Sequence, residues 1–165
     1  MNVHELLRLL DEYIPNPSEG LPEEVFLLIS RLTPLVNVDL LIKDENNRTL
    51  LSWRDDKYTG TGWHLPGGIV RFKETLETRV KKVADIEIGT QMDTDLIPIN
   101  MNQMIYEHEH DIRSHFISFL YKCFLPASFI LKNKGLSNLD SGYLEWHNTC
   151  PDNLLECQKI YKNFM

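Results

Sequence analysis

Residues 63–89 constrain the fold of this 165-residue chain more than any other segment. An aromatic and apolar run leads into Pro66-Gly67-Gly68, and a second apolar run follows it, which is typical of extended chain around a tight turn. Between residues 74 and 88 the apolar side chains recur at helical spacing, and Gly89 stands where a helix commonly ends. The segment therefore predicts an extended stretch with a glycine turn, followed directly by one helix.

Strands and helices alternate irregularly along the rest of the chain. Apolar residues at every second position from Val36 to Ile42 predict a strand with Asp39 on its other face. A polar turn and a second extended segment follow, which predicts a hairpin, and residues 55–62 are expected to form a polar loop. Further strands are expected at 97–106, 115–124 and 143–147, and helices at 3–14, 22–32 and from 151 onward. Helices mixed with hairpin-connected strands indicate an α+β domain or an α/β sandwich.

Length and charge exclude several classes of protein. The chain is long enough for one domain with a proper core, and the Pro- and Gly-containing break at 15–20 divides an N-terminal helical extension (1–20) from that domain (21–165). With 17 basic and 24 acidic residues the net charge is −7, which argues against a general nucleic-acid binder. No apolar run is long enough to span a membrane, so we expect no membrane partner.

The cysteines and the N-terminus predict a cytoplasmic protein. The three cysteines are too few and too odd in number for a disulfide framework, so reduced thiols are expected. The first residues lack the basic segment and apolar run of a secretory signal.

The glycine turn and the helix that follows resemble the Nudix hydrolase box. That pattern is a Gly, five residues, Glu, seven residues, Arg-Glu, an apolar residue, any residue, Glu-Glu, any residue and Gly. Gly68, Glu74, Glu87 and Gly89 stand at the matching positions. The resemblance implies an α/β/α sandwich with a mixed sheet, here with an extra N-terminal helix, and a divalent metal site.

Two of the three catalytic acidic positions at the end of the box are apolar in this chain. Lys82 occupies the Arg position, Val83 and Ile86 occupy the first two of these acidic positions, and Glu87 is the one of the three that remains an acid. Three carboxylates on one helix face would hold two or three Mg²⁺ ions, whereas one carboxylate holds about one, completed by a carbonyl, water and substrate phosphates. One Mg²⁺ is therefore expected, with Mn²⁺ as the alternative ion.

This pattern of missing acids is similar to the GDP-mannose mannosyl hydrolase branch of the Nudix family. The similarity extends to the stretches around Asp39 and Arg54 and to the aromatic approach to the box. It implies that the Gly67 carbonyl and Glu87 bind Mg²⁺ and that Asp39 contacts the nucleotide sugar. Arg54 would bind the substrate and take a catalytic part by steadying the diphosphate leaving group. Lys82 is expected to be a further substrate-binding residue.

The general base of that branch has no counterpart here. An alignment on Trp146 places Asp140 at a metal-binding Gln and Ser141 at the catalytic His, while Phe116 stands at a catalytic Tyr. Asp140 is thus expected to bind metal and act in catalysis. Asp140, Glu145 and His147 all remain open as the base, since a base must only reach the proton that it takes.

The resemblance implies hydrolysis of a nucleoside diphosphate sugar, GDP-mannose-like, to nucleoside diphosphate and sugar, by a homodimer. Two alternatives stay open: ordinary pyrophosphate cleavage of another nucleoside diphosphate derivative, or a catalytically weak domain that binds a nucleotide or a protein partner. The polar stretch with His108, His110 and His115 is interpreted as a solvated loop rather than a metal cluster, because no second ligand set has a recognised spacing.

Overall fold

A mixed β-sheet forms the centre of the protein. The computed structural model describes residues 2–92, 94–95, 97–107 and 112–165. The strands are β1 (Leu35–Lys43), β2 (Thr49–Asp56), β3 (Gly60–His64), β4 (Gly67–Ile69), β5 (Asn100–Ile105), β6 (His115–Phe124) and β7 (Leu144–His147). The helices are α1 (Val3–Tyr13), α2 (Glu23–Leu32), α3 (Leu76–Val83), the π-helical turn η1 (Ala84–Ile88) and the 3₁₀ helix η2 (Glu156–Phe164).

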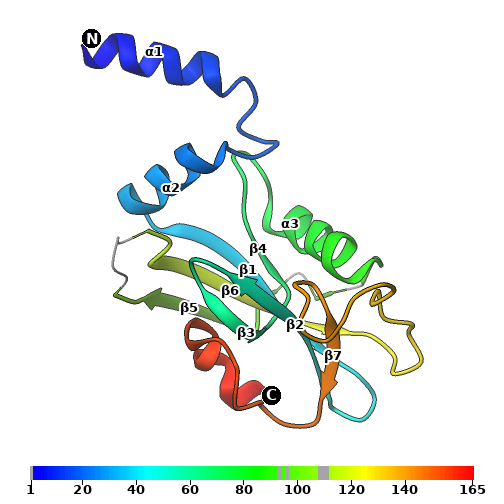
Figure 1. Ribbon diagram of the computed structural model, residues 1–165. Helices are drawn as coiled ribbons and strands as arrows, with labels where there is room; N and C mark the ends of the chain where they lie inside the picture. Colours follow the sequence, from blue (N-terminus) through cyan, green and yellow to red (C-terminus); the bar gives the residue numbers. More distant parts are fainter. Residues whose placement is uncertain (1, 93, 96, 108–111) are drawn as a thin grey trace.

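The strand order of the sheet is β3-β2-β1-β6-β5, with β4 paired to β1 and β7 paired to β2 (Figure 1). The pairing of β1 with β6 is parallel, and the other pairings are antiparallel. The mixed sheet confirms the fold class expected from the sequence.

One edge of β1 is shared between two strands. Its first half pairs with β4, where Val38 lies opposite Gly68, and its last residue pairs with the start of β2, where Lys43 lies opposite Thr49. The bond from Leu40 N–H to Pro66 O, at 2.8 Å, is the last on the β4 side. The sheet therefore forks at this point, and β2 and β4 diverge from each other.

Two helical layers cover the two faces of the sheet (Figure 1). Helix α3 and the η1 turn pack on one face, and η2 with the segment before it packs on the other. The core of the first layer includes Val38, Leu40, Leu50, Val83 and Ile88, and that of the second includes Leu41, Leu51, Trp53, Trp63 and Tyr161. Since neighbouring residues of a strand point to opposite faces, β1 and β2 are buried on both sides.

A buried carboxylate fixes the start of α3. Glu74 lies 2.5 Å from Arg79 Nη2 and 2.9 Å from Lys82 Nζ, and its side chain is only 5% exposed. Burial alone would raise the pKa of Glu74, but hydrogen bonds from the Arg71 backbone, Lys82 and Arg79 outweigh it and lower the pKa. Glu74 therefore remains ionised and ties the turn after β4 to the helix.

The predicted helix over 74–88 is confirmed with a change in its last turn. Regular α-helix runs from Leu76 to Val83, and a π-helical turn continues it to Ile88. Thr75 caps the start by accepting a hydrogen bond from Thr78 N–H at 3.1 Å. Gly89 ends the helix with φ of 83°, a left-handed conformation that favours glycine.

Three details differ from the sequence prediction. The loop expected at 55–62 is a tight hairpin, because Asp56 accepts hydrogen bonds from the backbone N–H groups of Tyr58 and Thr59, both at 2.8 Å, and closes the turn. The final helix is a 3₁₀ helix that begins at Glu156. The strand expected at 97–106 covers only Asn100–Ile105.

The N-terminal extension lies apart from the sheet. Helix α1 projects away from the other elements, and none of its residues is buried (Figure 1). The division of the chain at residue 20 stays a prediction. Within the described residues, no helix has the length and apolar character needed to cross a membrane.

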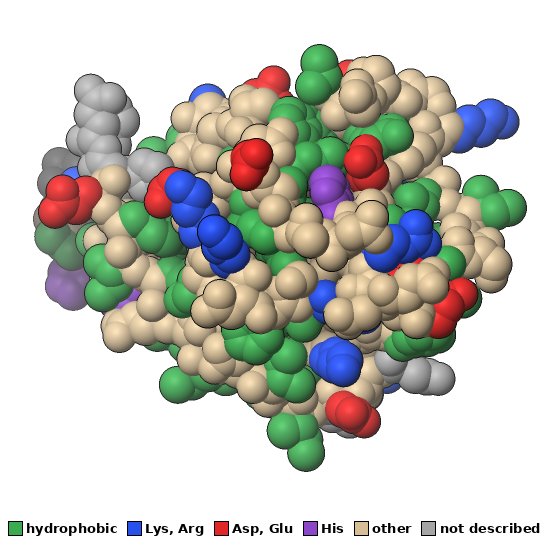
Figure 2. All heavy atoms as spheres, turned by 90° about the horizontal axis from the view of Figure 1, so that it is seen from below, with side chains coloured by type: hydrophobic (Ala, Val, Ile, Leu, Met, Phe, Trp, Pro, Cys, Tyr) green, Lys and Arg blue, Asp and Glu red, His purple; other side chains and the backbone are tan. Residues whose placement is uncertain are grey.

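One face of the molecule has no large patch of a single charge. Seen from the side below the view of Figure 1, acidic and basic side chains are interspersed among hydrophobic and polar ones (Figure 2). No broad basic surface gathers on this face, which is in keeping with the net charge of −7. The absence of a nucleic-acid partner remains an expectation.

Replacement of Glu74 tests the ion pair that anchors α3. We expect Glu74→Gln to lower the free energy of unfolding by about 3 kcal/mol, because it leaves the buried Arg79 without its counter-charge. Glu77→Gln removes an exposed pair with Lys81 and should cost at most about 1 kcal/mol. Urea unfolding of both variants measures the difference, and equal losses would contradict the anchoring role.

Candidate active site

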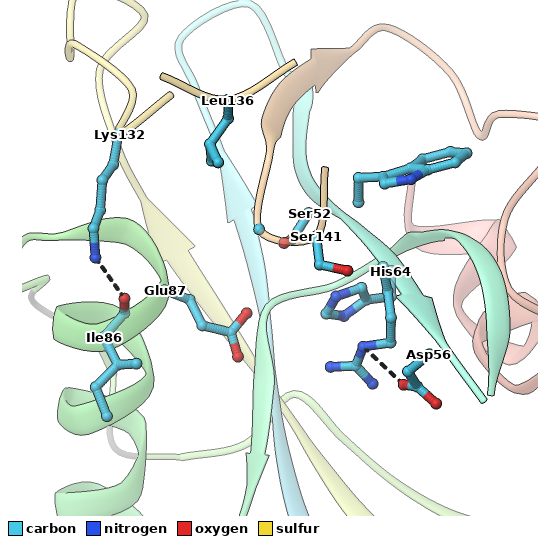
Figure 3. A pocket seen from close by; sticks show the side chains of 11 residues that line it. Ser52, Asp56, His64, Ile86, Glu87, Lys132, Leu136 and Ser141 are labelled. Carbon is cyan, nitrogen blue, oxygen red and sulfur yellow. Dashed lines mark hydrogen bonds and ion pairs between the residues drawn. The ribbon is translucent and has the colours of Figure 1, made fainter. Parts of the chain in front are cut away.

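A cavity of about 510 Å³ opens where the sheet forks. Its lining comes from β2, β3, the η1 turn and the loops before β7. Figure 3 shows Glu87 pointing from the helix across this space toward the side of His64 and Asp56, with Ser52 and Ser141 above the space in this view. The lining residues are Ser52, Trp53, Arg54, Asp56, His64, Ile86, Glu87, Lys132, Leu136, Ser141 and Gly142.

Glu87 is the acid of this cavity that the helix supplies. Burial raises its pKa to about 7, Arg54 opposes that rise, and Asp39 adds to it. Its Oε1 accepts a long hydrogen bond of 3.4 Å from Gly67 N–H. The carboxylate is thus poised between its two protonation states near neutral pH, and a cation placed beside it would favour the ionised form.

Gly67 directs its backbone N–H toward Glu87, although the residue lines a second cavity rather than this one. It lies opposite Asp39 in β1. Along the same ladder, Leu40 N–H donates to Pro66 O and Val70 N–H donates to Val36 O. Hydrogen-bonded and non-bonded pairs alternate along an antiparallel ladder, so Gly67 turns its N–H and C=O away from β1. A Cβ at this position would overlap Asp39 Oδ1 and lie 2.8 Å from Val38 O, so only glycine fits.

Arg54 and His64 face Glu87 from the strands. Arg54 shares the face of β2 that carries Leu50 and Ser52, and Ser52 pairs across the ladder with His64. The Arg54 guanidinium lies 3.7 Å from Asp56, the ion pair drawn in Figure 3. Sequence reasoning placed Arg54 in the site, and the structure brings it beside Glu87.

His64 is a neutral hydrogen-bond acceptor in this cavity. Its Nδ1 lies 2.7 Å from Leu65 O, and since a carbonyl only accepts, Nδ1 carries the proton and Nε2 carries the lone pair. Burial, with a further contribution from Arg54, lowers the pKa of His64 to about 3. Sequence reasoning missed this residue, although it directly precedes the Leu-Pro-Gly-Gly turn.

Asp39 is buried rather than exposed at the surface of its strand. Its Oδ2 accepts hydrogen bonds from Ser118 Oγ and from Tyr161 OH, the latter at 2.7 Å. Burial raises the pKa of Asp39, and these hydrogen bonds oppose the rise. Asp39 thus approaches Gly67 from the η2 side, whereas Glu87 approaches Gly67 from the α3 side. Asp39 also lines the second cavity, of about 640 Å³, together with Arg54 and His64.

Lys82 and Asp140 contact residues other than Glu87. Lys82 binds Glu74 and lines neither cavity. Asp140 is exposed and accepts hydrogen bonds from the N–H of Ser137, at 2.6 Å, and from its hydroxyl, which lower its pKa. Among the predicted site residues, the structure gathers Asp39, Arg54, Gly67 and Glu87 and leaves these two outside, so their predicted roles rest on the resemblance alone.

The residues that stand at catalytic positions of the resembled branch are divided between the core and the cavity lining. Val83 is buried in the core, whereas Ile86 is 60% exposed and lines the cavity beside Glu87. Phe116 is buried with Leu35 and Met104. The Ser141 hydroxyl accepts from Asp55 N–H at 2.9 Å, which holds the loop before β7 against β2.

The other base candidates and His115 lie outside the cavity lining. Glu145 is exposed, and His147 packs edge-on against Trp63 with 4.6 Å between ring centroids. His115 lies 3.0 Å from the Gln103 amide. His108 and His110 belong to the segment outside the described residues.

The oxygens at the fork fit one divalent cation. Across the described part of the chain, no three His, Cys, Asp or Glu side chains are grouped as a metal site. Mg²⁺ in nucleotide enzymes commonly takes one or two carboxylates and completes its shell with water and phosphate oxygens. The Glu87 carboxylate, which accepts from Gly67 N–H, and the Gly67 carbonyl, which turns away from β1 on the same side, provide such a partial set.

The raised pKa of Glu87 predicts a pH-dependent stability difference. Because the folded state holds this proton up to pH about 7 and the unfolded chain releases it near 4.5, Glu87 stabilises the fold at low pH, and this contribution is lost as pH rises through 7. Without divalent cations, the Glu87→Gln variant should therefore gain stability relative to wild type as the pH rises from about 4.5 to about 7. Urea unfolding at several pH values measures it, and a constant difference would contradict the raised pKa.

Comparisons with known proteins establish the fold. No family model matches the chain. The low-salt glycan biosynthesis protein Agl8 of Haloferax volcanii is 33% identical over 95 residues, which cover 58% of this chain and 57% of that protein. The match thus spans little more than half the length of this curated relative.

Solved structures match over more of the chain. The MutT Nudix hydrolase from Burkholderia pseudomallei superposes with a TM-score of 0.63 at 19% identity, over 81% of this chain and 98% of that one. The MutT protein from Methanosarcina mazei Go1 gives 0.59 at 20% identity, over 80% and 94%. The chain therefore has the Nudix hydrolase fold.

Proposed function

We propose that this protein is a Mg²⁺-dependent hydrolase of a nucleoside diphosphate sugar, GDP-mannose-like, that releases the nucleoside diphosphate and the sugar. One observation carries the proposal. Arg54 is a cation suited to a diphosphate, and Glu87 is the acid that remains at the catalytic positions of the box. Both face one cavity at the fork of a Nudix-type sheet. A volume of about 510 Å³ is within the usual range for small-molecule sites.

The charged groups suit a diphosphate leaving group. Arg54 presents a planar fork of N–H donors that matches two phosphate oxygens. Glu87 and the Gly67 carbonyl would hold Mg²⁺. The ion, when bound, would supply positive charge to the diphosphate as negative charge accumulates on it. Arg54 adds a fixed positive charge in a partly buried site, where electrostatic stabilisation is stronger than in water.

The remaining polar groups suit a sugar. His64 Nε2 accepts but does not donate in its neutral form, so it would receive a hydrogen bond from a sugar hydroxyl. Lys132 Nζ, which donates to Ile86 O at 2.9 Å, and the backbone of Gly142 border the same cavity. Ile86 offers an apolar surface for a sugar ring. Sequence reasoning singled out neither His64 nor Lys132 as a site residue.

The curated relative adds independent support for a sugar substrate. Its name places it in glycan biosynthesis, and glycans are built from activated sugars. An enzyme that acts on a nucleotide sugar fits that setting better than one that acts on a free nucleotide. Assembly as a homodimer is part of the proposal, and the exposed apolar side chains of α1, such as Val3, Leu7 and Tyr13, would gain cover from a second subunit.

A nucleotide-binding domain without turnover is the second candidate. Val83 and Ile86 in place of two acids favour it, because they leave one carboxylate on the helix face where the Nudix box has three. This candidate and the hydrolase share the diphosphate site at Arg54. They differ in whether a bound nucleotide sugar is cleaved.

A panel of nucleotide sugars separates these candidates. We expect Mg²⁺-dependent release of nucleoside diphosphate from at least one of GDP-mannose, GDP-glucose, UDP-glucose and ADP-ribose. Release of a nucleoside monophosphate would indicate pyrophosphate cleavage instead. Binding of a nucleotide sugar without any product would favour the binding domain.

The role of Glu87 has a matched control two residues away. Glu87→Gln should reduce kcat/KM roughly 100-fold and weaken Mg²⁺ binding, because the neutral amide is a poorer ligand. Asp85→Asn removes an exposed acid of the same helical turn and should leave both quantities unchanged within about twofold. Steady-state kinetics across a Mg²⁺ titration provides the readout. Equal effects of the two substitutions would remove Glu87 from the site.

A further inference from the structure

The second cavity continues from the proposed diphosphate site into an apolar chamber. It measures about 640 Å³ and shares Arg54 and His64 with the first cavity. Apolar and aromatic side chains make up much of its wall, among them Phe26, Ile29, Leu35, Met104, Tyr106 and Phe116. Such a wall suits a flat nucleobase, whereas the first cavity has the hydroxyl-binding groups.

Arg113 stands at the boundary between this wall and Arg54. Its guanidinium lies over the rings of Tyr58, at 5.4 Å, and Phe26, at 5.9 Å. Its backbone adopts φ of 53°, which is uncommon for a residue with a side chain, and its N–H donates to Ser30 Oγ at 3.0 Å. Ser30 is itself buried in α2. The chain thus accepts local strain to hold Arg113 in this position.

Arg113 has unused hydrogen-bonding capacity. Its Nε is buried and has no hydrogen-bond partner within the described residues. Burial lowers the pKa of Arg113, Asp56 opposes this, and Arg54 adds to it. The two arginines therefore repel each other, and both are attracted to Asp56, whose carboxylate already accepts hydrogen bonds from Thr59 Oγ1 and two backbone N–H groups.

The other arginines of this cavity are already engaged. Arg79 is paired with Glu74, and Arg71 donates to the backbone oxygen of Glu19. Arg54 and Arg113 are thus the two arginines of this cavity that repel each other, and within the described residues Asp56 is the one carboxylate that forms an ion pair with Arg54. A bound anion with two charged centres would relieve their repulsion and supply acceptors for the buried donor.

We propose that Arg113 is a second phosphate-binding residue, which together with Arg54 grips the diphosphate of a nucleotide whose base occupies the apolar chamber. The inference rests on the proposed function for the substrate class, since it identifies how that substrate lies in the cleft. The nucleoside lies toward Phe26 and Phe116, and the sugar lies toward Glu87 and Lys132. Arg113 is a binding residue in this arrangement and takes no part in bond cleavage.

Equilibrium binding tests the role without any turnover. The probes are GDP, ADP, UDP and CDP, measured by calorimetry in EDTA and again with Mg²⁺. For the tightest of the four, Arg113→Gln should weaken binding about tenfold or more, because a charged hydrogen bond to phosphate is lost. Arg31→Gln removes an exposed arginine of α2 that lines neither cavity and should leave the dissociation constant within about twofold.

Arg113→Lys keeps the charge and the aliphatic stem but not the planar fork, so it should lose affinity by less than Arg113→Gln. Thermal denaturation shows whether each variant is folded. If Arg113→Gln does not fold, Arg113→Lys still tests the role of Arg113. Unchanged affinity in a folded Arg113 variant would overturn the proposal, as would a wild-type protein that binds none of the four nucleotides at millimolar concentration.

Two experimental outcomes distinguish the role of Arg113 from the proposed hydrolase function. A protein that binds a nucleoside diphosphate through Arg113 but cleaves no nucleotide sugar retains this inference and loses the proposed hydrolase function. An active hydrolase whose Arg113→Gln variant has unchanged KM and unchanged nucleotide affinity retains the function and loses this inference.

Discussion

The forked edge of β1 is the constraint on which the site depends. The first half of this edge pairs with β4 and its end pairs with β2, so β2 and β4 must separate. Side chains from the helix enter the space between these two strands. Gly67 makes the fork possible, because only a residue without Cβ fits beside Asp39 while turning its N–H and C=O outward. The Glu74–Arg79 ion pair then fixes the helix that carries Glu87. The site is thus positioned by backbone pairing and one buried ion pair.

The sequence predicts the elements that depend on local patterns. The hairpin of β1 and β2, the glycine turn and the helix to Gly89 all follow from spacing, and the resemblance places Arg54 and Glu87 in the site. The surroundings of Asp39 depend on η2, which follows in the chain by more than a hundred residues, so no local pattern indicates its burial against Tyr161. Arg113 is equally hidden, because its position is set by Ser30 and two aromatic rings distant in sequence.

The apolar replacements in the box and the arginines of the cleft point to the same chemistry. A site with one carboxylate on its helix can hold fewer cations than the complete box, so more of the charge on a diphosphate must be met by arginine. Arg54 faces Glu87, and Arg113 extends the positive region toward the apolar chamber. In the proposed function, the charged centre of the cleft would hold the diphosphate, its polar end the sugar and its apolar end the base.

Hydrolysis of the preferred nucleotide sugar in oxygen-18 water tests the central claim most directly. Phosphorus NMR distinguishes labelled from unlabelled phosphate, and mass spectrometry detects the label on the sugar. If the chain releases an intact nucleoside diphosphate by cleaving the bond between sugar carbon and oxygen, the label appears on the sugar and the diphosphate is unlabelled. Label on a phosphate would mean that water attacks phosphorus, which would contradict the proposed reaction.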